Sequence, residues 1–203
     1  MASGRETDDL LRAVLELQKG IRVEANSRRI FELYYPWVCR FFGRLGYAPQ
    51  DSEDLAQETF SHIFERIGSF RHEGSFKSWL FAVASNLNRN EYRRRHQEKR
   101  RRPEVSIDTA AEPDGALPEL ASPGAAPDQT AYATERREAL SRAMAGLPPQ
   151  MRQVLSLRVD QDLKYREIAI VLQISIETVK AHLFQARQRL RDELGEDYGE
   201  WGD

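Results

Sequence analysis

The chain has 203 residues, enough for one large domain or two small ones. Its formal net charge of −2 argues against a general nucleic-acid coat protein, and no apolar run approaches the roughly 20 residues of a membrane span. The N-terminus, MASGRETDDLL, lacks the apolar core of a secretory signal, and one cysteine, Cys39, can form neither an internal disulfide nor a zinc site alone. We therefore expect a soluble protein of a reducing cytoplasm.

Apolar residues at helical spacing predict two helices near the N-terminus. The first is short and spans about residues 10–17. The second runs from about Ile30 to Leu45, has a broad aromatic face, and is ended by Gly46. Pro36 lies inside this second stretch, at a point where a helix kinks or breaks.

Two further helices follow before residue 102. Asp51 is positioned to cap the third helix and Gly68 to stop it, while Ser75 is positioned to cap the fourth. The side chains expected to face the core are Ala56, Phe60, Ile63, Phe64 and Ile67 on the third helix, and Trp79, Leu80, Val83, Ala84 and Leu87 on the fourth.

The fourth helix changes character along its length. It begins apolar and aromatic, as FKSWLFAVASNLN, and continues as RNEYRRRHQEKRRRP, and residues 93–102 hold seven Lys or Arg and one acid. Guanidinium groups pair with phosphate oxygens, and asparagine offers a donor and an acceptor to a base edge. The pattern favours a helix anchored in a core and held against a polyanion. The alternative is a solvated, charged helix end with no partner.

The third helix carries a polar, acidic outer face. Asp54, Gln57 and Glu58 are three and four residues apart, so they share one side of the helix. Such a face is better suited to a basic protein partner than to DNA, although a plain solvent-facing surface is the default interpretation.

Residues 103–130 separate the two basic parts of the chain. They hold five of the nine prolines, and residues 103–134 hold six acids and no base. A segment of this composition cannot bury enough apolar area to form a core, so it predicts a linker rather than a long loop within one domain.

Residues 165–191 read as a helix, a tight polar turn and a second helix. Ile168, Ala169 and Leu172 form one short apolar stripe, and Val179, Leu183, Ala186 and Leu190 form another. Ser175 is suited to capping the second helix. The pattern is typical of a helix-turn-helix, which places its second helix in a DNA major groove, although a two-helix corner of a bundle can look alike.

The sequence offers nothing that supports independent catalysis or a bound cofactor. The four histidines, His62, His72, His96 and His182, have no Cys or carboxylate at metal-ligand spacing. No nucleophile-elbow or phosphate-loop motif is present. We expect no enzyme, no metal and no cofactor.

Taken in order, four segments resemble the extracytoplasmic-function type of bacterial sigma factor. DSEDLAQETF resembles the segment that binds the polymerase clamp, and FKSWLFAVASNLNRNEYRRR the segment that reads and opens the minus-ten element. LPPQMRQVLSLRVDQDLKYREIA resembles the entry into the second domain, and ISIETVKAHLFQARQRLR the minus-35-reading helix.

The resemblance implies roles for individual residues. Asp54, Gln57 and Glu58 would contact the clamp helices of the largest polymerase subunit, and the polymerase flap is a further expected partner. Loop residues 71–76 would accept a flipped minus-ten base. The residues implied to bind promoter DNA are Arg71, Phe76, Lys77, Asn86, Asn90, Arg93 and Arg94 in the first domain, and Thr178, Lys180, Ala181, His182, Phe184, Gln185 and Arg187 in the second. The acidic linker would thread the RNA-exit and active-site channel.

The chain departs from the family pattern at several positions. Asn90 stands where the family usually has Asp, which removes a charge and a possible partner for an arginine. Ala181, His182 and Gln185 fall where Ser and Arg are common, so the minus-35 preference is open. Gln173 replaces the common turn glycine, which requires either a strained left-handed residue or a different turn.

The expected architecture is all-α, with two small helical domains joined by a flexible linker. The expected boundaries are an N-terminal extension at 1–24, region 2 at 25–102, the linker at 103–131, and region 4 with a short acidic tail at 132–203. The expected function is that of an alternative sigma factor. Many members of this family are held inactive by an anti-sigma protein, which is therefore a further candidate partner. The rivals are a stand-alone helix-turn-helix regulator and an adaptor that only docks on polymerase.

Overall fold

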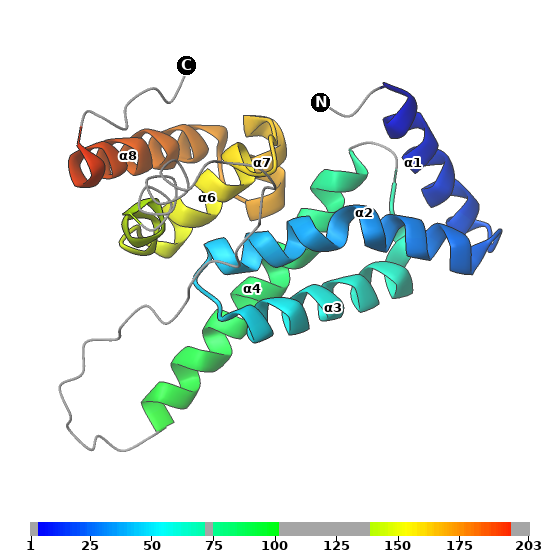
Figure 1. The fold of residues 1–203 in the computed structure, drawn as a ribbon, viewed down its shortest axis with the longest axis horizontal. Coiled ribbons are helices and arrows are strands. Elements are labelled where there is room, and N and C mark those ends of the chain that lie inside the picture. The colour runs from blue at the N-terminus through cyan, green and yellow to red at the C-terminus, as the bar shows by residue number, and fades with distance from the viewer. Residues whose placement is uncertain (1–3, 72–74, 102–138, 196–203) are drawn as a thin grey trace, which may run out of the picture. The chain divides into compact units, whose positions relative to one another are not determined.

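The computed structural model describes residues 4–71, 75–101 and 139–195, and the side chains of residues 9–71, 75–97 and 139–195 (Figure 1). All regular structure within these ranges is helical, so the predicted all-α fold with two helical domains is confirmed. The chain divides into two compact units, residues 1–39 with 50–108 and residues 40–49 with 109–203. The predicted linker and loop residues 72–74 lie outside the described residues. No described helix is long and apolar enough to cross a membrane.

Helix α1 (Gly4–Gln18) and most of α2 (Val23–Arg44) begin the first unit, whereas residues 40–44 at the end of α2 belong to the second. Asn26 is buried at their turn and donates hydrogen bonds to Glu16 Oε2 at 3.1 Å and to the Ile21 carbonyl at 3.0 Å. Gln18 donates to the carbonyl oxygens of Ile67 and Phe70 at 2.9 and 2.8 Å. These bonds tie α1 to residues 67–70, which follow the third helix.

Helix α2 starts two turns before the predicted Ile30 and runs through Pro36 without ending there. Proline removes one backbone hydrogen bond, which leaves the carbonyl of Glu32 without its usual helical partner. Both Glu32 and Pro36 are exposed, so water can bind that carbonyl. Of the two predicted outcomes, a kink or a break, the break does not occur, and the proline lies on the solvent side of the helix.

Helix α3 (Pro49–Arg66) is followed by the short 3-10 helix η1 (Ile67–Ser69). The prediction that Asp51 caps α3 was wrong, because the helix already begins at Pro49 and Asp51 lies in its first turn. Proline suits a first helical position since its fixed φ matches the helix and its missing N–H would have no partner there. The predicted inward residues of α3 are buried except Phe64, which is half-buried.

Helix α4 (Phe76–Arg101) is capped as predicted, with the Ser78 backbone N–H donating to Ser75 Oγ at 3.1 Å. Its first half is anchored in an aromatic cluster, in which the Phe76 ring lies 5.8 Å from Tyr34 and 5.5 Å from Phe70. Leu80, Phe81, Ala84 and Leu87 are buried, whereas Trp79 and Val83 are only half-buried.

In the second unit, residues 139–145 are helical and precede α6 (Pro149–Val159), α7 (Tyr165–Leu172) and α8 (Ile176–Leu194). Helix α6 packs against both α7 and α8, and α7 also packs against α8. The core between them contains the fully buried Val154, Leu157, Ile168 and Val179. This core leaves the outer side of α8 exposed.

The turn between α7 and α8 uses a left-handed residue. Gln173 has φ 57° and ψ 45°, and the Ile174 N–H closes the turn onto the Ala169 carbonyl at 3.1 Å. The first of the two predicted possibilities for this turn is therefore confirmed. Ser175 then caps α8 by accepting from the Thr178 N–H at 3.0 Å, as predicted.

Candidate nucleic-acid interface

The outer face of α4 carries polar side chains in one line. Asn86, Asn90 and Arg93 are exposed and are spaced by four and three residues, which places them on one side of the helix. The opposite side holds Ala84 and Leu87 in the core. The core thus fixes which side chains α4 presents, and it presents two amides and a guanidinium.

The predicted site also includes two cations, Lys77 and Arg71, and one aromatic residue, Phe76, at or just before the start of α4. Lys77 lies on α4 with its Nζ 5.6 Å from the centroid of the Trp37 ring on α2, a cation–π arrangement. Arg71 is exposed just after η1. Phe76 is only 5% exposed and belongs to the aromatic core, so it can support the loop before it but presents little surface of its own.

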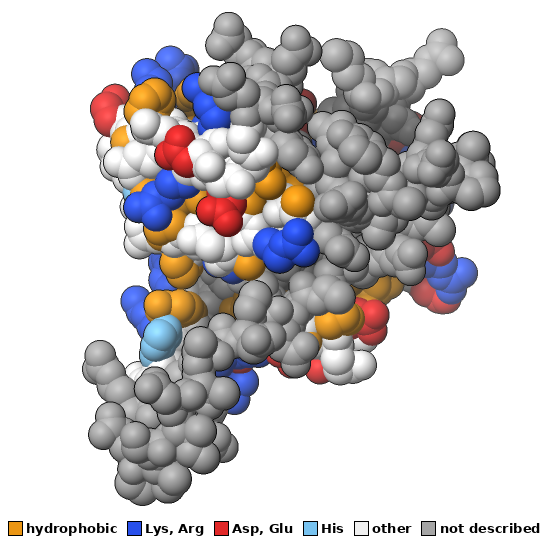
Figure 2. Space-filling model, turned by 60° about the vertical axis from the view of Figure 1, so that its left-hand side comes forward, with side chains coloured by type: hydrophobic (Ala, Val, Ile, Leu, Met, Phe, Trp, Pro, Cys, Tyr) orange, Lys and Arg blue, Asp and Glu red, His pale blue; other side chains and the backbone are white. Residues whose placement is uncertain are grey.

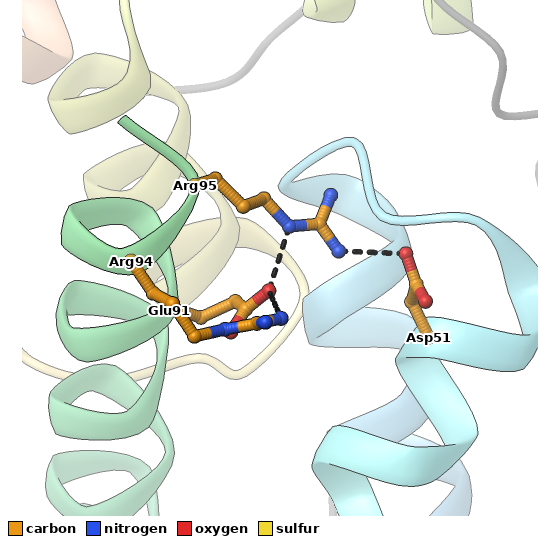
Figure 3. A network of polar contacts seen from close by, with 4 residues as sticks. All are labelled: Asp51, Glu91, Arg94 and Arg95. Carbon is orange, nitrogen blue, oxygen red and sulfur yellow. Dashed lines mark hydrogen bonds and ion pairs between the residues drawn. The ribbon is translucent and has the colours of Figure 1, made fainter. Parts of the chain in front are cut away.

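A network of four charged residues links the second half of α4 to α3 (Figure 3). Arg94 donates from Nε and Nη2 to the two carboxylate oxygens of Glu91, both at 2.7 Å. Arg95 donates from Nε to Glu91 Oε1 and from Nη2 to Asp51 Oδ2, again at 2.7 Å. The network therefore joins α4 to the first turn of α3.

These bonds change the acidity of Glu91. The hydrogen bond from Arg94, followed by that from Arg95, outweighs partial burial and lowers the Glu91 pKa from 4.5 to about 2. Glu91 is therefore charged across the physiological range. Its carboxylate is largely covered, at 13% exposure, whereas the Arg94 side chain is 62% exposed.

Helix α8 presents most of its predicted DNA-facing residues to solvent. Lys180, Ala181, Phe184 and Gln185 are exposed, and Thr178, His182 and Arg187 are half-exposed. The Phe184 ring is 68% exposed, which is unusual for an aromatic side chain on a packed helix. Phe184 therefore points away from the core formed by Leu183 and Ala186.

The predicted polymerase-binding residues lie together on α3. Asp54, Gln57 and Glu58 are all exposed, opposite the buried Leu55 and Phe60. Gln50 donates a long hydrogen bond of 3.5 Å to Asp54, and His62 lies 3.7 Å from Glu58. These contacts are weak and surface-exposed, so they leave the face able to meet a partner.

The face of the molecule drawn in Figure 2 mixes Lys and Arg with apolar, uncharged and a few acidic side chains. Within the described ranges, no group of three or more His, Cys, Asp or Glu residues is arranged to hold a metal ion. Cys39 is half-buried, and burial raises the pKa of its thiol. A raised pKa disfavours the reactive thiolate, as expected for a cysteine that packs rather than reacts.

The sequence predictions missed Glu91, Arg95, Asp51 and Trp37 as neighbours of the site. The spacing of Glu91 to Arg94 and Arg95, three and four residues, is a signal for local ion pairs that was available in the sequence. The contacts of Arg95 with Asp51 and of Lys77 with Trp37 join residues 44 and 40 positions apart, and only the packing of the helices reveals them.

Two segments of the chain match known family models. Residues 30–98 match "Sigma-70 region 2", and residues 137–190 match "Sigma-70, region 4". The RNA polymerase sigma-H factor of Pseudomonas aeruginosa is 30% identical over 178 residues, which cover 83% of this chain and 88% of the relative. The chain belongs to the sigma-70 family. The ECF RNA polymerase sigma-E factor of Escherichia coli is 28% identical over 182 residues, covering 85% of this chain and 91% of the relative. The predicted resemblance to the extracytoplasmic-function type of sigma factor is therefore confirmed.

Two solved structures share the fold of this sigma-family chain. One is a sigma factor RpoE in complex with the anti-sigma factor NepR from Bartonella quintana, with 23% identity, a TM-score of 0.64, and coverage of 82% of this chain and 95% of that one. The other is CnrH in complex with the cytosolic domain of CnrY, with 18% identity, a TM-score of 0.60, and coverage of 93% and 97%. At these identities the likeness concerns the fold.

Proposed function

We propose that the chain is an alternative sigma factor that binds core RNA polymerase, recognises the minus-35 and minus-ten promoter elements, and helps to melt the DNA for transcription initiation. The observation that carries the proposal is the division of α4 into an anchored half and an exposed half. The same helix is fixed in an aromatic core at Phe76 and exposes Asn86, Asn90 and Arg93 further along.

The exposed half of α4 is suited to the minus-ten element. Amide side chains read base edges and guanidinium groups bind phosphates, so one helix face can both hold and read a separating strand. Lys77, Asn86, Asn90, Arg93 and Arg94 bind the separating strands. Arg71 and Phe76 lie at the two ends of the loop, residues 71–76, that would accept a flipped base, whose extrusion costs a few kcal/mol that the new contacts must return.

The exposed face of α8 is suited to the minus-35 element in the major groove. Lys180 and Arg187 supply positive charge for phosphates or guanine edges, and Gln185 offers a bidentate pair to adenine. The ring of Phe184 is suited to contact a thymine methyl group. His182 has its Nδ1 shielded from solvent, with no hydrogen-bond partner among the described residues, so Nε2 is the nitrogen able to reach DNA.

The acidic face of α3 is suited to the polymerase. Asp54, Gln57 and Glu58 present two carboxylates and an amide to the clamp helices of the largest subunit, and the second unit docks on the flap. An anti-sigma protein is a further candidate partner, because one solved structure of this fold is a sigma factor bound to the anti-sigma factor NepR. The chain works in the cytoplasm with the polymerase, without a cofactor and without catalytic activity of its own.

Run-off transcription over a promoter library tests this proposal. Core polymerase is assayed with and without the purified chain, and transcripts that need the chain should share a minus-35 and a minus-ten sequence. A chain that changes nothing about promoter choice while still binding core polymerase would be an adaptor. Activity that depends on an operator but not on a two-part promoter would favour a stand-alone regulator.

A further inference from the structure

Glu91 belongs to a network of ion pairs that links α4, the proposed DNA-binding helix, to α3, the proposed polymerase-binding helix. Its carboxylate binds Arg94 through two bonds and Arg95 through one, all at 2.7 Å. Arg95 continues the chain of contacts to Asp51 on α3 (Figure 3). Asp51 precedes Asp54, the first proposed polymerase-binding residue, by a single turn of that helix.

The bond geometry fixes the orientation of Arg94. A guanidinium held at Nε and Nη2 by both oxygens of one carboxylate has its plane set by the fork, so the side chain loses much of its rotational freedom. Arg94 is 62% exposed and Glu91 only 13%. The carboxylate therefore lies beneath the guanidinium and holds it outward, rather than covering it.

Residue 90, next to Glu91, adds no charge to this arrangement. Asn90 is exposed on the outer face of α4 and carries no charge, whereas Glu91 supplies a carboxylate one position later, on the side that meets α3. The acid thus holds arginines without adding negative charge to the line formed by Asn86, Asn90 and Arg93.

We propose that Glu91 is a positioning residue for promoter melting. It orients Arg94 toward the separating DNA strands and, through Arg95 and Asp51, fixes that orientation relative to the polymerase-binding face of α3. Glu91 itself touches neither DNA nor polymerase. The inference rests on the proposed sigma function and names a residue on which the melting step depends.

The test compares Glu91→Gln with Glu24→Gln. Glu24 forms a similar pair with Arg28 four residues later, at 2.7 Å, but is exposed on α2 and lies outside the Glu91 network. Each variant is added as full chain to core polymerase, and three quantities are measured. These are affinity for core, the rate of open-complex formation on a duplex promoter from permanganate reactivity of unpaired thymines, and the same signal on a promoter that is already unpaired at minus-ten.

Glu91→Gln should slow opening of the duplex promoter about tenfold, in line with losing one charge-assisted hydrogen-bonded pair. Affinity for core should stay within about twofold of wild type, and the unpaired promoter should recover most of the lost signal, because strand separation no longer has to be driven. Glu24→Gln should match wild type in all three. Asp51→Asn should also slow opening, and Asp51→Asn with Glu91→Gln should be less than additive because both belong to one network.

Three results would overturn the proposal. Faster opening by Glu91→Gln would mean that the carboxylate competes with DNA phosphate. An equal loss of permanganate signal on duplex and unpaired promoters would show that Glu91 contributes only to folding. Circular dichroism at the assay temperature would reveal the same defect. If Glu91→Gln opened the duplex promoter as fast as Glu24→Gln, Glu91 would have no role in promoter melting. If wild type and Glu24→Gln both fail to open any promoter, the sigma function itself is wrong and the inference falls with it.

Discussion

Gln173 shows how a single residue can adopt a backbone conformation that its side chain disfavours. Its φ of 57° lies in the left-handed region, where a β-carbon crowds the following carbonyl. The turn nevertheless forms, because Ile174 closes onto the Ala169 carbonyl and the apolar stripes of α7 and α8 meet in the core. The strain at this residue is offset by the packing on either side.

Gln173→Gly should therefore stabilise the second unit by up to about 1 kcal/mol, since glycine adopts this φ at little steric cost. Thermal and urea unfolding would measure the change. Gln188→Gly, at an exposed position inside α8, is the matched control and should destabilise by about 1 kcal/mol. Destabilisation by both variants would show that the Gln173 side chain contributes more than its strain costs.

Glu91 gives a pH dependence with a definite sign. Its pKa falls from 4.5 to about 2 on folding, so the charged form stabilises the fold above pH 4.5 and that contribution is lost as the pH falls toward 2. The full shift would correspond to about 3 kcal/mol, but screening at the exposed Arg94 reduces the expected contribution to about 1–2 kcal/mol.

Wild type should thus be more stable than Glu91→Gln by about 1–2 kcal/mol at pH 7, with the difference shrinking between pH 4.5 and pH 2. Urea unfolding at several pH values would measure it. A difference that stays constant over this range would show that the charge of Glu91 does not stabilise the fold.

Among the helices, α4 and α8 are both held in a core so that one polar face stays exposed, but different contacts hold them. Helix α4 is fixed by an aromatic cluster at its start, and α8 is fixed along its length by α6 and α7. In both helices the buried stripe determines which side chains face outward. The two proposed DNA contacts are therefore set by core packing as much as by the polar residues themselves.

Lys180→Ala combined with Arg187→Ala should weaken minus-35 recognition by about tenfold or more while leaving core binding intact, because each removed cation contributes a phosphate or base contact. Transcription from promoters with and without a minus-35 element would measure the loss. Arg189→Ala with Arg191→Ala, further along the same helix, is the control and should have a smaller effect. Unchanged transcription by the first pair would count against the assignment of α8.

Asp54→Arg should weaken binding to core polymerase by about tenfold or more, because it places a cation where the α3 face is proposed to meet a basic surface. A competition assay for core polymerase would measure the affinity. Glu32→Arg makes the same charge change at an exposed position of α2 and should have little effect. If the two variants bound core polymerase with equal affinity, the α3 face would be a plain solvent-facing surface and not a polymerase contact.

At the scale of the whole molecule, the two proposed DNA contacts belong to separate units of one chain. Two modules on one tether gain effective concentration once the first is docked, so neither needs high affinity alone. The net charge of −2 and the acids of residues 103–134 oppose binding by the free chain.

The free chain should therefore shift promoter DNA weakly in a gel assay, and added core polymerase should strengthen binding at least about a hundredfold, as expected for linked sites. A promoter with both elements scrambled is the control for non-specific binding. A tight shift by the chain alone, unaffected by polymerase, would instead indicate a stand-alone regulator.

Much of the local structure could be predicted because it depends on neighbouring residues. Ser75 and Ser175 cap the helices that follow them, and the apolar stripe of Val179, Leu183, Ala186 and Leu190 is buried as its spacing indicates. Helix starts were predicted less well. Proline at position 49 begins α3 before Asp51, and the exposed side of α2 tolerates Pro36.

Caps, periodicity and motifs act over a few residues, so the all-α fold, the family and the candidates for DNA and polymerase contact could be predicted from the amino-acid order alone. How those candidates are presented depends on tertiary packing. Phe76 is drawn into the core by Tyr34 and Phe70, while Arg95 is linked to α3 by Asp51. These contacts join residues far apart in the chain, and such pairings depend on how the helices pack.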